Sequence, residues 1–214
     1  MKDSVQRMDF RADFYRLLSS LFLHEVSLEF LKNLSSSNQA SPNFEGLILT
    51  EGNTWETLKE ELDVDFARIF LGLGPLTAFP YESIYKGSLG LLMQKPFEEV
   101  REFYGKAGIK KNPDLKEPDD HIGIELAFMV NLCSQAKVAL KNDKKEEVLS
   151  LLERQKQFLQ NHLLTWVPSL CKDIQTAAQT DFYKSLAALL NSWISSDSQE
   201  LNSLIEWLKS KGRS

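Results

Sequence analysis

Apolar residues recur every three to four positions through most of this sequence, and this period is the feature that most constrains the fold. Within residues 4–23, one helical face collects Val5, Met8, Ala12, Tyr15, Leu18 and Phe22. No segment longer than four residues alternates apolar and polar side chains as a half-buried strand does. The sequence therefore predicts an all-α, bundle-like fold with roughly nine or ten helices.

The same period predicts helices over the remaining chain. They cover 27–34, 53–70, 96–107, 118–141, 144–164, 167–178, 180–195 and 198–210. Asn53, with Glu56 three residues later, resembles a capping box. Asp143, Thr180 and Ser196 are the other residues expected to cap helix starts.

Two segments interrupt the helical pattern. Residues 72–95 hold four glycines and two prolines, yet they are rich in Leu, Phe and Tyr, so this segment must pack against or bind something. The run IKKNPDLKEP then reads as a linker. We divide the chain into an N-terminal part (1–112), a hinge (113–120) and a C-terminal part (118–214). Whether these form one globule or two sub-domains joined before Pro118 stays open at this stage.

Charge and composition exclude several classes of protein. The chain has 214 residues, a formal net charge of −5 and a pI near 5.4, which argues against nucleic acid as a partner. No window approaches the ~18 apolar residues of a membrane span. Cys133 and Cys171 lie far apart in apolar helical patterns, as buried free thiols do. We expect a soluble cytoplasmic protein without stable membrane insertion.

Catalytic constellations are absent from the sequence. His121 and Glu125 share a helix face, but a zinc site needs a third ligand, so a surface ion pair across one turn is the favoured interpretation. GLGPLTAFP lacks the GK[ST] ending of a phosphate loop. No nucleophile stands in a glycine-framed elbow. We expect no enzyme activity, no cofactor and no metal.

The stretch KEPDDHIGIELAFM, residues 116–129, places three carboxylates and a histidine at an expected helix start. Pro118 suits a first helical turn, and carboxylates near a helix N-terminus gain only ~0.3–1 kcal/mol each. Three such groups also repel one another, so helix-start chemistry alone explains the cluster poorly. The alternative is a patch that binds an arginine-bearing ligand.

These residues resemble the TorD/DmsD family of redox-enzyme maturation chaperones. The blocks that carry the resemblance are EPDDHIGIELAFM, FARIFLGLGPLTAFPYESIY upstream and HLLTWVPSL with DFYKSLAALL downstream, spanning about residues 10–195. The resemblance implies a cytoplasmic chaperone that binds the twin-arginine signal peptide and the apo form of a molybdenum-cofactor oxidoreductase of the dimethyl sulfoxide reductase type. Such a chaperone assists cofactor insertion and delays export through the twin-arginine (Tat) pathway. It implies a monomer that can also form a domain-swapped dimer.

The resemblance also implies a signal-peptide-binding site. Glu117, Asp120 and His121 fall on the polar side of that site, and Phe70, Pro80 and Tyr81 on its apolar side, with Trp in some members where this chain has Tyr81. Glu82 and Tyr85 complete the predicted set. Ile84, Leu91 and Leu92 are further candidates to accept the apolar part of a leader.

Three other interpretations remain at this stage. The chain could be a NarJ-like assembly chaperone of a membrane-bound reductase, or a general all-α interaction module that recognises a folded surface. A nucleotide hydrolase is the third, and its missing phosphate loop counts against it.

Overall fold

The computed structural model describes residues 2–36 and 54–211, and over these ranges the predicted all-α fold is confirmed. Its helices are α1 (Lys2–Leu23), α2 (Leu28–Ser36), α3 (Trp55–Phe70), α4 (Glu82–Lys86), α5 (Lys95–Lys106), α6 (Ile122–Lys141), α7 (Lys145–Phe158), the π-helical segment η2 (Leu159–Leu163), α8 (Leu164–Ala177) and α9 (Asp181–Lys211). The described residues hold one β feature, an isolated antiparallel bridge between Tyr81 and His121.

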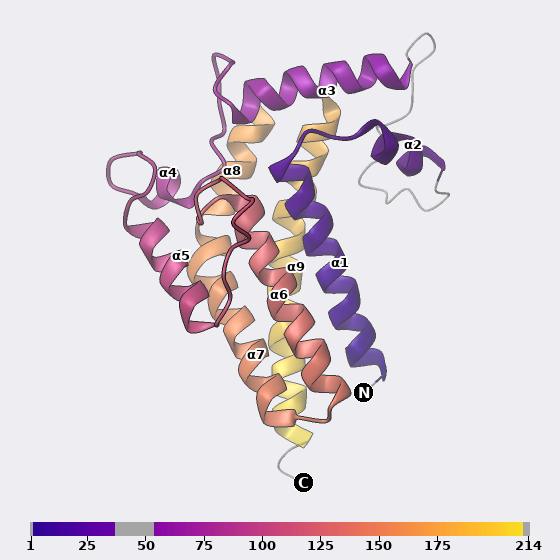
Figure 1. The fold of residues 1–214 in the computed structure, drawn as a ribbon, viewed down its shortest axis with the longest axis vertical. Helices are drawn as coiled ribbons and strands as arrows, with labels where there is room; N and C mark the ends of the chain where they lie inside the picture. Colours follow the sequence, from indigo (N-terminus) through magenta and orange to yellow (C-terminus); the bar gives the residue numbers. More distant parts are fainter. Residues whose placement is uncertain (1, 37–53, 212–214) are drawn as a thin grey trace.

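The long helices α1, α6, α7, α8 and α9 run along the long axis of the molecule and form its bundle (Figure 1). Helix α3 lies across one end of the bundle, and α4 and α5 lie along one flank (Figure 1). The most extensive contact between two helices joins α1 to α6, from opposite halves of the chain. The two halves therefore share one core, and the non-helical segment between α5 and α6 connects them. Its role as a hinge stays a prediction.

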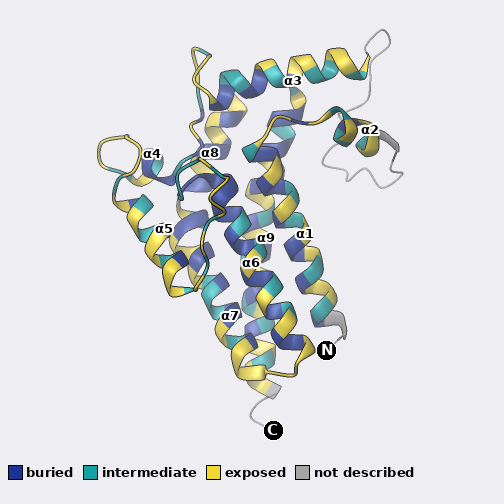
Figure 2. Cartoon of the chain, in the orientation of Figure 1, coloured by how far each residue is buried: buried dark blue, intermediate teal, exposed yellow. Residues whose placement is uncertain are grey.

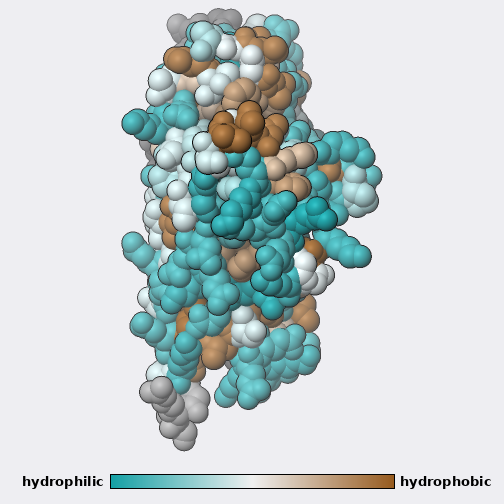
Figure 3. Space-filling view, turned by 90° about the vertical axis from the view of Figure 1, so that its left-hand side faces the viewer, coloured by the Kyte–Doolittle hydropathy of each residue, from teal (hydrophilic) through white to brown (hydrophobic). Residues whose placement is uncertain are grey.

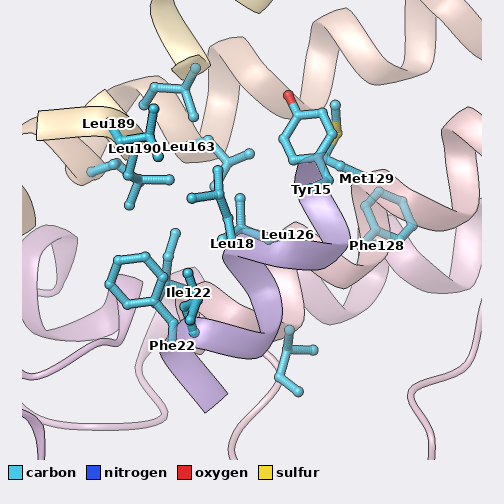
Figure 4. Packing of buried hydrophobic residues seen from close by; sticks show 14 of the residues in the cluster. Tyr15, Leu18, Phe22, Ile122, Leu126, Phe128, Met129, Leu163, Leu189 and Leu190 are labelled. Carbon is cyan, nitrogen blue, oxygen red and sulfur yellow. The ribbon is translucent and has the colours of Figure 1, made fainter. Parts of the chain in front are cut away.

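The core forms where the apolar faces of these helices meet. Tyr15, Leu18 and Phe22 of α1 lie among side chains of α6, η2 and α9 (Figure 4), and all three are buried. The buried residues face the bundle interior while the exposed ones face outward (Figure 2). Full burial of one large apolar side chain contributes roughly 1.5–3 kcal/mol, so this shared face holds the two halves together.

Helix α6 is the most apolar of the long helices. By length and composition Ile122–Lys141 could cross a membrane, but 61% of that window is buried inside the bundle. Cys133, on its inner face, is a buried free thiol, and so is Cys171 of α8. This burial is that of a core helix in a soluble protein.

Helix α9 corrects the prediction of two helices over 180–195 and 198–210. Ser196, expected as a cap, lies inside one continuous helix. Asp197, the residue after the expected cap, faces the core and is paired with Arg11, whose Nη2 donates to its Oδ2 at 2.8 Å. Because that charge is compensated, the buried stripe continues through it from Ile194 to Leu201.

Other predicted boundaries also shift. The break expected between 164 and 167 is absent, because η2 joins α7 to α8 without an interruption. Counting that run as one helix, the described residues hold eight helices, slightly fewer than expected. Helix α6 begins at Ile122 rather than at Pro118. Asp143 does not cap α7, since it has a positive φ of 55° and the cap position is Lys144.

The start of α3 is capped differently from the sequence prediction, and the start of α9 has an additional buried acceptor. Asn53 lies outside the described residues, and the capping box of α3 pairs Thr54 with Thr57 instead of using Glu56. Near the start of α9, the carboxylate of Asp65 accepts hydrogen bonds from the N–H groups of Gln179 and Thr180 at 3.0 and 2.8 Å. Thr180 directly precedes Asp181, the first residue of α9, so it lies at the expected cap position, and its hydroxyl donates to the same Asp65 carboxylate at 2.7 Å.

Candidate functional site

The Gly/Pro-rich segment is fastened to the start of α6 by backbone hydrogen bonds. The N–H of Ile122 donates to the carbonyl of Pro80 at 2.8 Å, and the N–H of Glu82 donates to the carbonyl of Asp120 at 3.0 Å. These bonds create the Tyr81–His121 bridge. They bring together residues that the sequence separates by about forty positions, and six of the eight predicted site residues meet here: Pro80, Tyr81, Glu82, Glu117, Asp120 and His121.

Asp120 is fully buried, and its carboxylate caps the first turn of α4, a helix to which it does not belong. Its Oδ2 accepts hydrogen bonds from the backbone N–H of Ser83, at 2.9 Å, and from the Ser83 hydroxyl. Ser83 is in the first turn of α4, where free N–H groups favour an anion. Asp120 Oδ1 has no hydrogen-bond donor. Burial raises the pKa of Asp120, and the Ser83 bonds oppose that rise.

His121 is the N-cap of α6 and is also buried. Its Nδ1 accepts a hydrogen bond from the N–H of Gly123 at 3.0 Å. Burial, together with the nearby His24, lowers the pKa of His121 to about 3, so the ring is neutral at physiological pH. The ring of Tyr81 meets it edge-on, with centroids 5.1 Å apart. His121 is thus a neutral cap, which corrects the expected surface ion pair with Glu125.

Glu117 and Tyr81 form the partly exposed rim of the site. The Tyr81 hydroxyl donates to Glu117 Oε2 at 2.6 Å, and burial together with Glu117 raises the pKa of Tyr81. Lys111 closes the same rim by donating to the carbonyl of Glu117 and pairing with Asp119 at 2.9 Å. The rim therefore already contains a cation of the chain itself, Lys111, which compensates part of the negative charge of the carboxylates.

A second buried acidic group lies under α4. Glu82 is fully buried and accepts from Lys86 Nζ at 2.6 Å, while His162 Nδ1 lies 3.0 Å from its other carboxylate oxygen. Glu125 is also fully buried, and its Oε2 accepts from the indole N–H of Trp166 at 3.3 Å. Burial and the neighbouring Glu82 raise the pKa of Glu125 well above its usual range.

Sequence reasoning included Glu82 but missed its partners. The i, i+4 spacing of Glu82 and Lys86 was the available signal. No such signal was available for His162, because its orientation depends on the π-helical geometry of η2. Such π-helical turns occur often at functional sites.

The two remaining predicted residues lie at the edges of this site. The ring of Tyr85 packs on Trp166, with centroids 5.5 Å apart, and its hydroxyl bonds to Asp173. Phe70 is buried in an aromatic cluster with Phe66 and Tyr183, away from the carboxylates. The structure therefore places Phe70 in the core beneath the segment rather than on its surface.

Exposed apolar side chains flank α4 on both sides. On one side are Leu71, Leu73, Leu76 and Phe79, and on the other Leu89, Leu91, Leu92 and Met93. We call these eight residues the apolar flanks. The face of the molecule that carries α4 and α5 shows hydrophobic side chains gathered in its upper half, above a largely hydrophilic surface (Figure 3). Most of the large hydrophobic residues that the described chain exposes belong to the flanks, and such clustering marks interaction sites.

Comparison with known proteins agrees with this picture of an all-α binding protein. The model of the nitrate reductase delta subunit family matches residues 25–172. Chaperone protein TorD of Vibrio atlanticus is 36% identical over 218 residues, covering 94% of this chain and 99% of that protein. Chaperone protein TorD of Vibrio parahaemolyticus is 32% identical, covering 89% and 94%.

Chaperone protein TorD of Vibrio cholerae is 30% identical and covers 92% of this chain. This chain belongs to the TorD family of chaperones, within the class that the nitrate reductase delta subunit model describes. The family resemblance inferred from the sequence is thereby confirmed, and a chaperone is a binding protein rather than an enzyme.

Proposed function

We propose that this protein is a cytoplasmic chaperone for a molybdenum-cofactor oxidoreductase of the dimethyl sulfoxide reductase type. It binds the twin-arginine signal peptide and the apo form of that enzyme, assists cofactor insertion and delays export through the Tat pathway until the enzyme has matured. Membership of the TorD family supports the chaperone role. The observation that carries the peptide-binding role is the pair of apolar flanks on either side of α4, the helix whose first turn contacts Asp120.

The chemistry of such a leader matches both parts of this surface. The two guanidinium groups of the leader can donate short charge-assisted hydrogen bonds to carboxylates. The apolar segment that follows them loses water when it lies against exposed leucines. Helix-in-groove receptors combine an apolar surface with polar contacts in the same way.

We assign the predicted binding residues two different tasks. Tyr81 and Glu117, at the partly exposed rim, contact the peptide directly. Pro80, Asp120 and His121 hold the rim in place from beneath, as do Glu82 and Tyr85 on α4, while Phe70 anchors the end of α3. This division follows from burial, since a fully buried carboxylate meets a ligand only if the structure opens.

Isothermal titration with a synthetic twin-arginine leader tests the proposal. Leaders are taken from the molybdoenzymes encoded in the same genome, and each is paired with a Lys-Lys version. We expect saturable binding that weakens about tenfold on the Arg-to-Lys exchange, because the bidentate contacts are lost. A protein that binds every leader and its Lys-Lys version equally well would contradict the arginine-recognising role.

Mutation of the buried positions tests the residue assignment separately. Asp120→Asn combined with His121→Ala weakens leader binding, because the rim loses its support. Circular dichroism first establishes that the double variant is folded. Wild-type affinity in that folded protein would remove the site assignment.

The family model gives a second candidate a specific basis, since its description is that of a nitrate reductase delta subunit. A NarJ-like chaperone would serve a membrane-bound reductase instead of an exported one. Pull-down with apo forms of both enzyme types distinguishes the two clients. A general interaction module would bind a folded partner and ignore every isolated leader.

A further inference from the structure

Lys86 occupies an unusual position at the end of α4. Its Nζ donates to the buried carboxylate of Glu82 at 2.6 Å and to the carbonyl of Asn161, in η2, at 2.8 Å. The Lys86 side chain is 27% exposed, whereas the Glu82 side chain is 0% exposed. A single cation therefore closes the outer edge of a buried acidic group, and it can leave that position without unfolding a helix of the bundle.

The acidic group behind Lys86 has more acceptors than donors. Glu82, Asp120 and Glu125 are all fully buried and interact electrostatically with one another. Within the described residues no donor reaches Asp120 Oδ1, while Glu125 shares a side-chain hydrogen bond with Glu82. An unsatisfied buried carboxylate oxygen lowers the stability of the protein. An additional N–H donor, beyond those of Lys86 and His162, would therefore stabilise this acidic group.

An open pocket lies on the solvent side of Lys86. It has a volume of about 540 Å³ and lies between the end of α4 and the start of α5. Its lining is Lys86, Gly87, Ser88, Gln94, Lys95, Pro96 and Glu99. The pocket borders the segment that carries Leu89, Leu91, Leu92 and Met93. A peptide lying on that flank could therefore place one side chain into the pocket.

We propose that Lys86 is an internal substitute for an arginine of the bound peptide, and that a guanidinium group entering this pocket displaces it from Glu82 and Asn161. The proposal rests on the leader-binding function proposed above and adds the residue that regulates access to the acidic group. Lys86 keeps the buried carboxylate compensated in the free protein. It leaves toward solvent when the ligand's cation arrives.

The geometry favours arginine over lysine as the displacing group. An ammonium group brought by a ligand would replace Lys86 with its own equivalent and gain no new contact. A guanidinium group carries five N–H donors in a planar fork, so it can bond to Glu82 and Asn161 and still have donors for the unsatisfied oxygen behind them. The exchange thereby discriminates arginine from lysine at this position.

Three variants test the proposal by calorimetric titration with the twin-arginine leader. Lys86→Met removes the competing cation at similar length, and we expect about tenfold tighter binding. Lys86→Arg fills the position with a guanidinium, and we expect binding no tighter than that of the wild type. Lys95→Met is the matched control, since it removes the same charge from the same pocket and Lys95 pairs with the exposed Glu99. Its affinity should stay within about twofold of the wild type.

Two results would overturn the proposal: Lys86→Met that binds no tighter than the wild type, or Lys95→Met that tightens binding as much as Lys86→Met. The second result would reveal a general charge effect. Lys86→Arg keeps the charge, so it remains informative if Lys86→Met does not fold: binding no tighter than that of the wild type supports the proposal, and tighter binding overturns it.

A measurement without any leader separates this inference from the proposed function. Ethylguanidinium at millimolar concentration should raise the thermal midpoint of Lys86→Ala, and ethylammonium should raise it less. Neither should stabilise the wild type, in which Lys86 fills the position. If no leader binds any variant but this rescue occurs, the guanidinium site stands and the peptide function fails. Equal effects of both cations on Lys86→Ala and wild type would refute the site itself.

Discussion

The carboxylate of Asp120 accepts two hydrogen bonds from Ser83, one from its backbone N–H and one from its hydroxyl, and it thereby begins a helix 37 residues earlier in the chain. The acidic motif around Asp120 was interpreted as the start of its own helix or as an arginine-binding patch. It does serve a helix start, but that of α4. Together with the backbone hydrogen bonds Ile122–Pro80 and Glu82–Asp120, this contact ties the Gly/Pro-rich segment to α6.

A double-mutant cycle between these residues measures their coupling. Asp120→Asn and Ser83→Ala should each lower the free energy of unfolding by about 1–3 kcal/mol, because each leaves a buried polar partner unsatisfied. Together they should cost less than the sum, with a coupling of roughly 1 kcal/mol. Urea denaturation supplies all four values. Additive effects would show that the two side chains do not interact in solution.

The buried His121 predicts a loss of stability in acid. Because its pKa falls from 6.5 in the unfolded chain to about 3 in the folded protein, the unfolded chain binds the proton more readily. The contribution of neutral His121 to the free energy of unfolding is complete above pH 6.5 and is lost as the pH falls toward 3. Between pH 7 and pH 4 the wild type should lose about 3 kcal/mol more than His121→Asn, which caps without titrating.

Urea titrations of both proteins at several pH values give this difference, and shared effects of other groups cancel in it. Parallel curves for the two proteins would show that folding does not lower the pKa of His121.

Gly123 and Gly105 form a matched pair for testing the α1–α6 contact. A Cβ at Gly123 would lie 2.5 Å from Leu23 Cγ and 3.1 Å from the carbonyl oxygen of Ser19, whereas one at Gly105 would meet nothing within 4 Å. Gly123→Ala should therefore cost about 1–3 kcal/mol through overpacking. Gly105→Ala, in α5, should stabilise by about 0.5 kcal/mol. Thermal unfolding of both variants checks this, and a neutral Gly123→Ala would indicate a looser helix contact.

The apolar flanks predict a loss of binding without a loss of stability. Leu91 and Val138 are each 58% exposed, but Leu91 lies in a flank and Val138 lies on α6. Leu91→Ser should weaken leader binding about fivefold, because it removes an apolar contact that contributes ~1 kcal/mol. Val138→Ser should leave leader binding unchanged. Both should keep their stability within about 0.5 kcal/mol. Equal affinities of the two variants would exclude this flank from the binding surface.

The expected domain exchange predicts a minor dimer. The segment from Ala107 to His121 connects two halves whose α1–α6 interface could be remade between two copies of the chain. Size exclusion with light scattering should show a monomer and a small dimer fraction that grows with protein concentration and exchanges slowly. A single monomer peak at every concentration would count against the hinge.

Much of the fold could be predicted because each long helix carries a continuous apolar stripe. Tyr15, Leu18 and Phe22 are spaced for one face, and that face is buried. Predictions failed where a polar residue lay within a stripe: the helix break expected after residue 195 is absent because Asp197 is buried against Arg11, which is in a helix at the opposite end of the sequence. A local pattern cannot reveal a partner so distant.

The sequence by itself determined the all-α class and most of the helical segments, because helical periodicity is a property of neighbouring positions. Of the eight site residues that the family resemblance implied, six lie together at the start of α6. Only the tertiary structure decided that Asp120 and His121 are buried caps, that Glu82 reaches His162 and Lys86, and that leucines on both sides of α4 remain exposed. Burial and partner choice depend on which segments pack together, and that packing is fixed by the whole core at once.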